Sequence, residues 1–169
     1  MTTAVIGATG RVGSELVRGL LARGDAVAAL VRDPDKARRA FGEPDGLHIR
    51  ATHLDDPRDL TEALDGIRTV FLAMGSIGIE GVLQRIAINA AAGISSIEQV
   101  TRLSVLNTSA DSRGINQRAH YSIDQFAASA AVPYSTIRPA IFSASLLAAA
   151  REVRASRTWT ARPAVAAWP

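Results

Sequence analysis

Short apolar segments alternate with segments of helical spacing along most of the chain. The apolar segments are four to eight residues long and rich in Val, Ile and Leu, which is typical of strands buried on both faces of a sheet. Six strands are therefore predicted, at residues 3–6, 26–31, 47–50, 69–74, 99–106 and 134–137.

Helices are predicted between these strands. The first ends near Gly24, a residue type that commonly follows a helix, and the second begins at Asp56 with Pro57 in its first position. Two more are expected at about residues 79–92 and 117–131. The residues predicted to face inward from the first two helices are Leu16, Val17, Leu20, Leu21, Leu60, Ala63 and Leu64.

The alternation of strands and helices predicts an α/β fold, a Rossmann-like doubly wound parallel sheet of about six strands. With 169 residues and 47% hydrophobic side chains, the chain is long enough for one domain with a substantial core, expected over residues 1–157. Residues 158–169 lack both periodicities and are interpreted as an irregular tail, either the end of a natural short form or the result of a truncation or a frame shift. Ligands of such sheets bind at the carboxyl ends of the strands.

The distribution of charge argues against nucleic-acid binding. Four arginines against Glu152 in the last nineteen residues account for the whole formal net charge of +3, so the body of the chain has no basic stripe. No cysteine and only three scattered histidines are present, so no metal site is expected. No apolar run approaches the ~20 residues of a membrane span, and no signal peptide precedes the first strand. A cytoplasmic protein is expected, and a homodimer stays open.

A glycine-rich loop follows the first predicted strand. Gly7, Gly10 and Gly13 stand at intervals of three between that strand and the first helix, which is the setting of a dinucleotide-binding turn. One glycine makes the turn, one lets the backbone approach the pyrophosphate, and one lets the helix pack on the strand. Thr9, Arg11 and Val12 complete the loop, whose helix N-terminus attracts phosphates.

The end of the second predicted strand indicates which dinucleotide is bound. Arg32 stands there, and an arginine at this place accommodates the 2′-phosphate of NADP. Arg11 in the glycine loop is a candidate second contact. NADP(H) is therefore favoured, while Asp33 keeps NAD(H) as the alternative, because a carboxylate would bind the ribose hydroxyl of NAD.

Five motifs, taken in order, resemble the NmrA-like atypical short-chain dehydrogenases/reductases. The resemblance covers about residues 2–157 and implies a Rossmann fold that usually binds NADP(H). It also implies one of several activities: quinone or azo-type reduction, isoflavone-reductase-like chemistry, or redox sensing with little turnover. The motifs are GATGRVG at residues 7–13, LVRDP at 30–34, LDDP at 54–57, RLS at 102–104 and YSTIRP at 134–139.

Three departures from the family pattern bear on the site. Thr52 and His53 replace the common Gly-Asp pair, so adenine recognition is expected to change, with His53 stacking on the base or merely forming a polar turn. Tyr121 is followed four residues later by Gln125 instead of Lys, so no lysine lowers the tyrosine pKa for acid catalysis. Family members also continue well past the point that matches residue 157, so the C-terminal substrate portion is expected to be missing.

The leading hypothesis is an NADPH-dependent reductase whose small-molecule substrate is a quinone or an aromatic ketone, since quinones accept hydride with little acid assistance. The alternatives are a non-enzymatic NADP(H)-binding redox sensor of the NmrA type and a remnant that binds nothing. Substrate would lie over the carboxyl ends of the fourth and fifth strands, near Met74, Gly75, Ser76 and Ser104. The candidate catalytic residues are Tyr121, His120 and Ser104, and the remaining cofactor-binding candidates are Leu54, Ala73, Met74 and Gly75.

Overall fold

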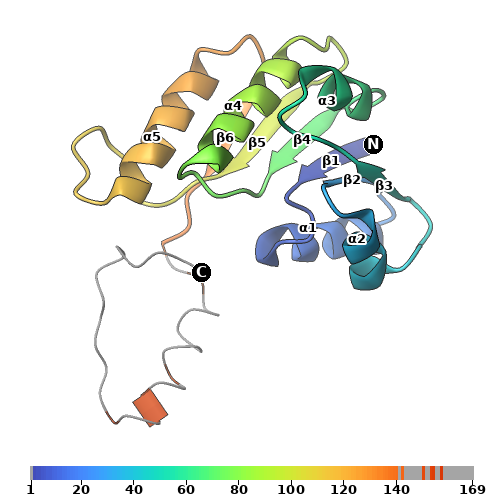
Figure 1. Ribbon diagram of the computed structural model, residues 1–169, viewed down its shortest axis with the longest axis horizontal. Helices are drawn as coiled ribbons and strands as arrows, with labels where there is room; N and C mark the ends of the chain where they lie inside the picture. The colour runs from blue at the N-terminus through green and yellow to red at the C-terminus, as the bar shows by residue number, and fades with distance from the viewer. Residues whose placement is uncertain (1, 141, 143–149, 151–152, 155–156, 158–169) are drawn as a thin grey trace.

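The computed structural model describes residues 2–140, 142, 150, 153–154 and 157, and the predicted tail at 158–169 lies outside these residues. Strands and helices alternate in the described part of the chain (Figure 1). The strands are β1 (Thr2–Ile6), β2 (Ala26–Val31), β3 (Leu47–Ala51), β4 (Thr69–Leu72), β5 (Gln99–Leu103) and β6 (Tyr134–Ile137). The helices are α1 (Arg11–Ala22), α2 (Pro34–Phe41), α3 (Pro57–Ala63), α4 (Ile79–Ala92) and α5 (Ile115–Ala128).

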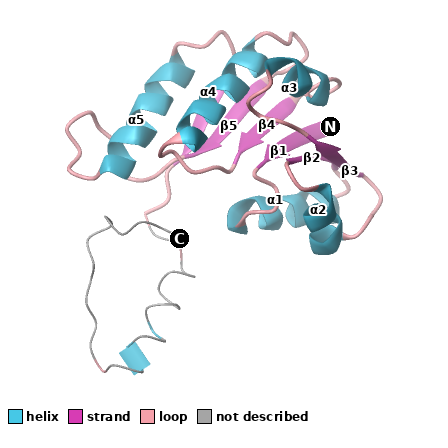
Figure 2. Cartoon of the chain, in the orientation of Figure 1, coloured by secondary structure: helices cyan, strands magenta, loops and turns pink. Residues whose placement is uncertain are grey.

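The strands form one parallel sheet in the order β3-β2-β1-β4-β5-β6. Helices α1 and α2 cover one face, and α3, α4 and α5 cover the other (Figures 1 and 2). The strand order reverses between β1 and β4, and in such sheets this switch point opens a crevice at the carboxyl ends of the strands. The predicted doubly wound, Rossmann-like fold is confirmed.

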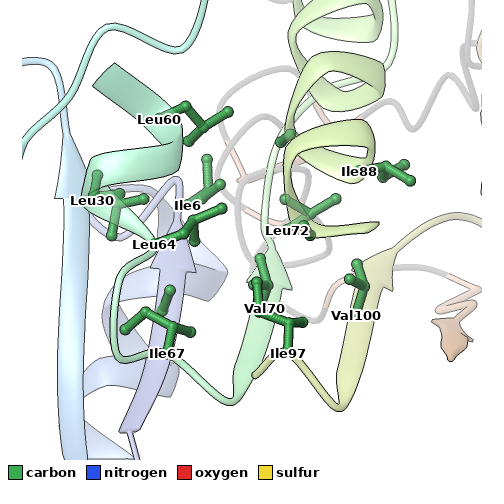
Figure 3. Packing of buried hydrophobic residues seen from close by; sticks show 14 of the residues in the cluster. Ile6, Leu30, Leu60, Leu64, Ile67, Val70, Leu72, Ile88, Ile97 and Val100 are labelled. Atoms are coloured by element: carbon green, nitrogen blue, oxygen red, sulfur yellow. The ribbon is translucent and has the colours of Figure 1, made fainter. Parts of the chain in front are cut away.

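Alternate residues of the central strands serve the two faces of the sheet. Ala4 and Ile6 of β1 belong to the apolar cluster under α3, α4 and α5, whereas Val5 between them belongs to the cluster under α1 and α2. Figure 3 shows the larger cluster, in which Leu60 of α3 and Leu64, the residue that follows α3, meet the side chains of the sheet. A sheet buried on both faces explains why the strand sequences are almost continuously apolar.

Helix α2 was not among the predicted helices. The Asp33 side chain accepts a hydrogen bond from the Lys36 backbone N–H at 2.9 Å, and Pro34 occupies the first helical position, so both start signals of a helix are present. Only Ala37 of its eight residues is buried. The apolar periodicity on which the sequence interpretation depends is therefore too weak to show it.

Two predicted strands and one helix extend further in the sequence prediction than in the structure. Pairing between β4 and β5 ends at Leu72 and Arg102, so the strands predicted to continue to residues 74 and 106 lose their shared ladder. The backbone after β4 still bonds to the strand on its other side, β1, since the Ala73 N–H donates to the Ile6 carbonyl at 2.9 Å. Helix α5 ends at Ala128 instead of residue 131 because the chain turns before Pro133 to enter β6.

None of the helices in the described part of the chain combines the length and the apolar character that crossing a membrane requires.

Candidate functional site

The glycine loop joins β1 to α1 by a close packing that side chains would prevent. Gly7 has a φ of +84° and begins a turn that ends at Gly10. The Gly10 N–H closes this turn by donating to the Gly7 carbonyl at 3.0 Å. A Cβ built on Gly7 would lie 2.3 Å from the Ala73 carbonyl oxygen, and one on Gly13 would lie 2.1 Å from the Gly7 carbonyl oxygen. Gly7 therefore lets β1 approach the end of β4, and Gly13 lets α1 pack beneath the loop.

A cavity of about 290 Å³ lies at the carboxyl ends of β1, β2 and β4. Eight of the predicted cofactor-binding residues line it: Gly7, Thr9, Gly10, Arg32, Leu54, Ala73, Met74 and Gly75. The remaining lining residues were not predicted: Ala8, Leu30, Val31, Lys36, Ile79, Glu80 and Leu83. Residues from four separate parts of the chain thus meet at the switch point of the sheet.

Two cations and no free carboxylate face this cavity at the end of β2. Arg32 and Lys36 both line it, and Lys36 stands on the first turn of α2, which the sequence interpretation missed. The Asp33 carboxylate, by contrast, accepts the Lys36 backbone N–H as the cap of α2. The charge that this end of the cavity offers to a ligand is therefore positive.

His53 lies outside the lining of the cavity. Its ring Nδ1 is 2.9 Å from Asp59 Oδ2, its backbone N–H donates to the same oxygen at 2.8 Å, and its side chain is 82% exposed. The hydrogen bond from the His53 backbone, followed by that from its ring, lowers the pKa of Asp59. Stacking of His53 on adenine stays a prediction.

A second cavity, of about 310 Å³, adjoins the first. Ala73 and Met74 line both cavities, so the two meet at the end of β4. Arg11 and Val12, predicted as parts of the cofactor loop, line this second cavity together with Leu103 and Phe142. Its walls are mostly apolar, with one arginine.

A buried polar network centres on Arg102 near the end of β5 and on Asp124 of α5. The Arg102 side chain is fully buried and that of Asp124 is 4% exposed. Arg102 Nε donates to Gln84 Oε1 at 2.6 Å, its Nη1 donates to Asp124 Oδ1, and its Nη2 donates to His120 Nδ1. Gln84 Nε2 in turn donates to the carbonyl of Gly75, a residue that lines the first cavity. The network thus supports the cavity wall from behind.

Asp124 collects three further donors. Ser104 Oγ donates to its Oδ2 at 3.1 Å, Tyr134 Oη donates to its Oδ1 at 3.0 Å, and Arg138 Nη2 donates to its Oδ2 at 3.1 Å. Burial raises the pKa of Tyr134. With the bond from Arg102, each of the two Asp124 carboxylate oxygens accepts two hydrogen bonds.

His120 takes part in this network as a neutral ring. Burial, and then the positive charge of Arg102, lower the pKa of His120 from 6.5 to about 4, against the opposing effect of Asp124. Because Arg102 donates to Nδ1, the ring proton is assigned to Nε2. Two of the three predicted catalytic residues, His120 and Ser104, therefore belong to one hydrogen-bond network. They are linked through Arg102 and Asp124.

Tyr121, the third predicted catalytic residue, lies on α5 half-buried. No hydrogen bond of its phenol to the described residues is present, and its catalytic role stays a prediction. Arg102, Asp124, Gln84 and Tyr134 were not predicted. The alternation of side chains along β5 could have indicated that Arg102 is buried. Val100, Arg102 and Ser104 point to the same face of the sheet, and all three are buried, whereas the residues between them are half-buried. Likewise, Asp124 shares a helical face with buried His120, Ile123 and Ala127.

Known proteins share this architecture. A family model described as NAD(P)H-binding matches residues 7–160. An NAD(P)H azoreductase from Xenophilus azovorans is 29% identical over 150 residues, and a sterol demethylase protein B from Methylococcus capsulatus is 37% identical over 81 residues. An NADPH-dependent quinone oxidoreductase from Escherichia coli, solved in complex with NADPH, superposes with a TM-score of 0.79 at 27% identity.

These relatives are longer than the present chain. The match to the azoreductase covers 89% of this chain and 51% of the relative, and the match to the sterol demethylase protein covers 47% and 24%. The quinone oxidoreductase structure is covered over 53% of its length by 89% of this chain. The family model, the strand order and the glycine loop nonetheless agree, and the chain belongs to the NAD(P)H-binding family, among the NmrA-like atypical short-chain dehydrogenases/reductases.

Proposed function

We propose that the protein is an NADPH-dependent reductase that passes hydride to a quinone or an aromatic ketone. The observation that carries this proposal is the junction of the two cavities at Ala73 and Met74. One cavity has the glycine loop and two cations of a dinucleotide site, and the other has apolar walls suited to a flat ring. A nicotinamide at the junction would face the second cavity.

Preference for NADP over NAD is part of the proposal. Arg32 and Lys36 offer two cations to a 2′-phosphate, whereas Asp33, the carboxylate that would bind a ribose 2′-hydroxyl, is engaged as a helix cap. The glycine loop fits a pyrophosphate because it leads into the N-terminus of α1, where free backbone N–H groups attract anions, and because Gly10 at the N-cap carries no side chain.

Bound NADPH would supply the chemistry, a hydride that carries two electrons and one proton. The chain's own residues would do the positioning: Leu103, Phe142 and Met74 form an apolar wall that holds the acceptor ring and excludes water. Arg11 adds a cation in the same cavity, where negative charge develops on the acceptor oxygen. Quinone, NADPH and one proton from solvent would give hydroquinone and NADP⁺.

A redox sensor that binds NADP(H) without turnover is the second candidate. The observation that favours it is the engagement of Ser104 and His120 in the buried network, together with Gln125 in place of a lysine after Tyr121. These residues offer a ketone no ready proton donor. A sensor would bind NADPH with the same loop and cations.

Two measurements test the proposal. Fluorescence titration with NADPH should show saturable binding, and steady-state assays should show NADPH oxidation by simple quinones. Phe142→Ser should lower kcat/KM for the quinone about tenfold through lost apolar contact, with the Kd for NADPH unchanged because Phe142 does not line the first cavity. NADPH binding without oxidation by any quinone or aromatic ketone would favour the sensor instead.

A further inference from the structure

We infer that Glu80 recognises the adenine of the cofactor by accepting a hydrogen bond from its 6-amino group. This inference rests on the proposed binding of NADPH in the first cavity, which the glycine loop lines. It assigns a specificity-determining role to a residue of α4, on the wall opposite the end of β3 where family members commonly have an aspartate.

Glu80 stands in a mostly apolar part of the cavity. Ile79 and Leu83, its neighbours on α4, line the same wall, and Leu30 and Leu54 line the cavity from β2 and from the loop after β3. Aliphatic side chains of this kind are suited to the faces of a planar base. Among the described residues that line this cavity, Glu80 is the only acid.

The Glu80 carboxylate is folded onto the backbone of Gly75. A Cβ built on Gly75 would lie 1.8 Å from Glu80 Oε2, so a side chain at position 75 would displace the carboxylate. Glu80 makes no hydrogen bond or ion pair with the described residues, and it is not among those with further partners. Its acceptor capacity is therefore available to a ligand.

The charge of Glu80 limits which part of a dinucleotide it can face. A carboxylate repels phosphate, so it does not serve the pyrophosphate at the glycine loop or the 2′-phosphate at Arg32 and Lys36. A neutral donor is the favourable partner. Arg32 and Lys36 mark the adenosine end of the cavity, and the exocyclic amine is the hydrogen-bond donor of an adenine ring.

The end of β3 does not supply this acceptor. His53 stands where the family commonly has aspartate, and its ring and backbone both face Asp59, outside the cavity lining. Asp59 Oδ2 in turn lies within hydrogen-bond distance of both the backbone N–H and the ring Nδ1 of His53. Glu80 would take over the task from the opposite wall.

The test compares NADPH with its hypoxanthine analogue, in which a carbonyl replaces the 6-amino group. The wild type should bind NADPH at least about tenfold more tightly, because the analogue has no donor at position 6 and turns an oxygen toward the carboxylate there. Glu80→Gln should bring the ratio of the two dissociation constants close to one, since a rotated amide serves either base. Taking the ratio cancels any general gain in affinity from removing a negative charge near the phosphates.

Glu62→Gln is the matched control, because Glu62 is an exposed carboxylate of α3 outside the cavity lining. It should keep the wild-type ratio. Equal affinity of the wild type for the two nucleotides, or a wild-type ratio in Glu80→Gln, would overturn the role of Glu80 while leaving NADPH binding intact. Failure of the wild type to bind NADPH at all would overturn both the proposed function and this inference.

Discussion

Replacing Asp124 with Asn should lower the free energy of unfolding by about 3 kcal/mol or more. The substitution keeps the volume but removes the charge that faces Arg102, whose side chain is fully buried. Asp124 accepts hydrogen bonds from Arg102, Ser104, Tyr134 and Arg138, and breaking a buried ion pair by removing one partner costs roughly 3–5 kcal/mol. An amide has one acceptor oxygen for these donors, so several lose their partner.

Urea denaturation followed by circular dichroism measures the loss. A double variant, Arg102→Met with Asp124→Leu, supplies the contrast, since replacing both charges with apolar groups is often neutral or stabilising. It should be more stable than Asp124→Asn alone. If the single substitution costs less than about 1 kcal/mol, the value of an ordinary neutral hydrogen bond, the network does not hold Arg102 by charge.

Four further outcomes are expected. Arg32→Asp should weaken NADPH binding by about 1.5–3 kcal/mol and shift preference toward NADH in a fluorescence titration, whereas unchanged NADPH affinity would remove Arg32 from the site. Gly10→Val should abolish binding of both cofactors with far-UV circular dichroism intact, because its side chain would stand where the pyrophosphate approaches; retained binding would refute this. Tyr121→Phe should cost at most about tenfold in quinone reduction, and a thousandfold loss would make Tyr121 a general acid. Because the folded His120 pKa is lowered from 6.5 to about 4, unfolded His120 takes up a proton first as pH falls. Stability should therefore drop through that window by up to about 1.4 kcal/mol per pH unit, and His120→Gln should flatten the profile by that amount.

The fold was predictable because the sheet is buried on both faces. The central strands β1 and β2 are therefore mostly apolar, whereas the edge strands β3 and β6 are only partly buried. All six strands were nonetheless visible in the sequence, with β2 and β6 at their observed bounds. Strand ends were less accurate where the sheet opens. Met74 and Leu106 continue the apolar pattern, but the ladder between β4 and β5 has already ended at Leu72 and Arg102.

The cofactor cavity was predicted better than the buried network. Glycine spacing is a local signal, and eight of the predicted residues do line the cavity, while their binding of a cofactor stays a prediction. Arg102 and Asp124 lie 22 residues apart on different elements, and a charged residue is ordinarily expected at the surface. Lys36 and Glu80 were missed because α2 was not predicted and because α4 gives no sign in its sequence of which residues face a ligand.

Single-turnover oxidation of protein-bound NADPH by a simple naphthoquinone tests the central claim most directly. The proposed hydride transfer predicts one hydroquinone formed for each NADPH consumed, at a rate that falls when the transferred hydrogen at the nicotinamide C4 is replaced by deuterium. Bound NADPH that stays reduced in the presence of the quinone would contradict the claim.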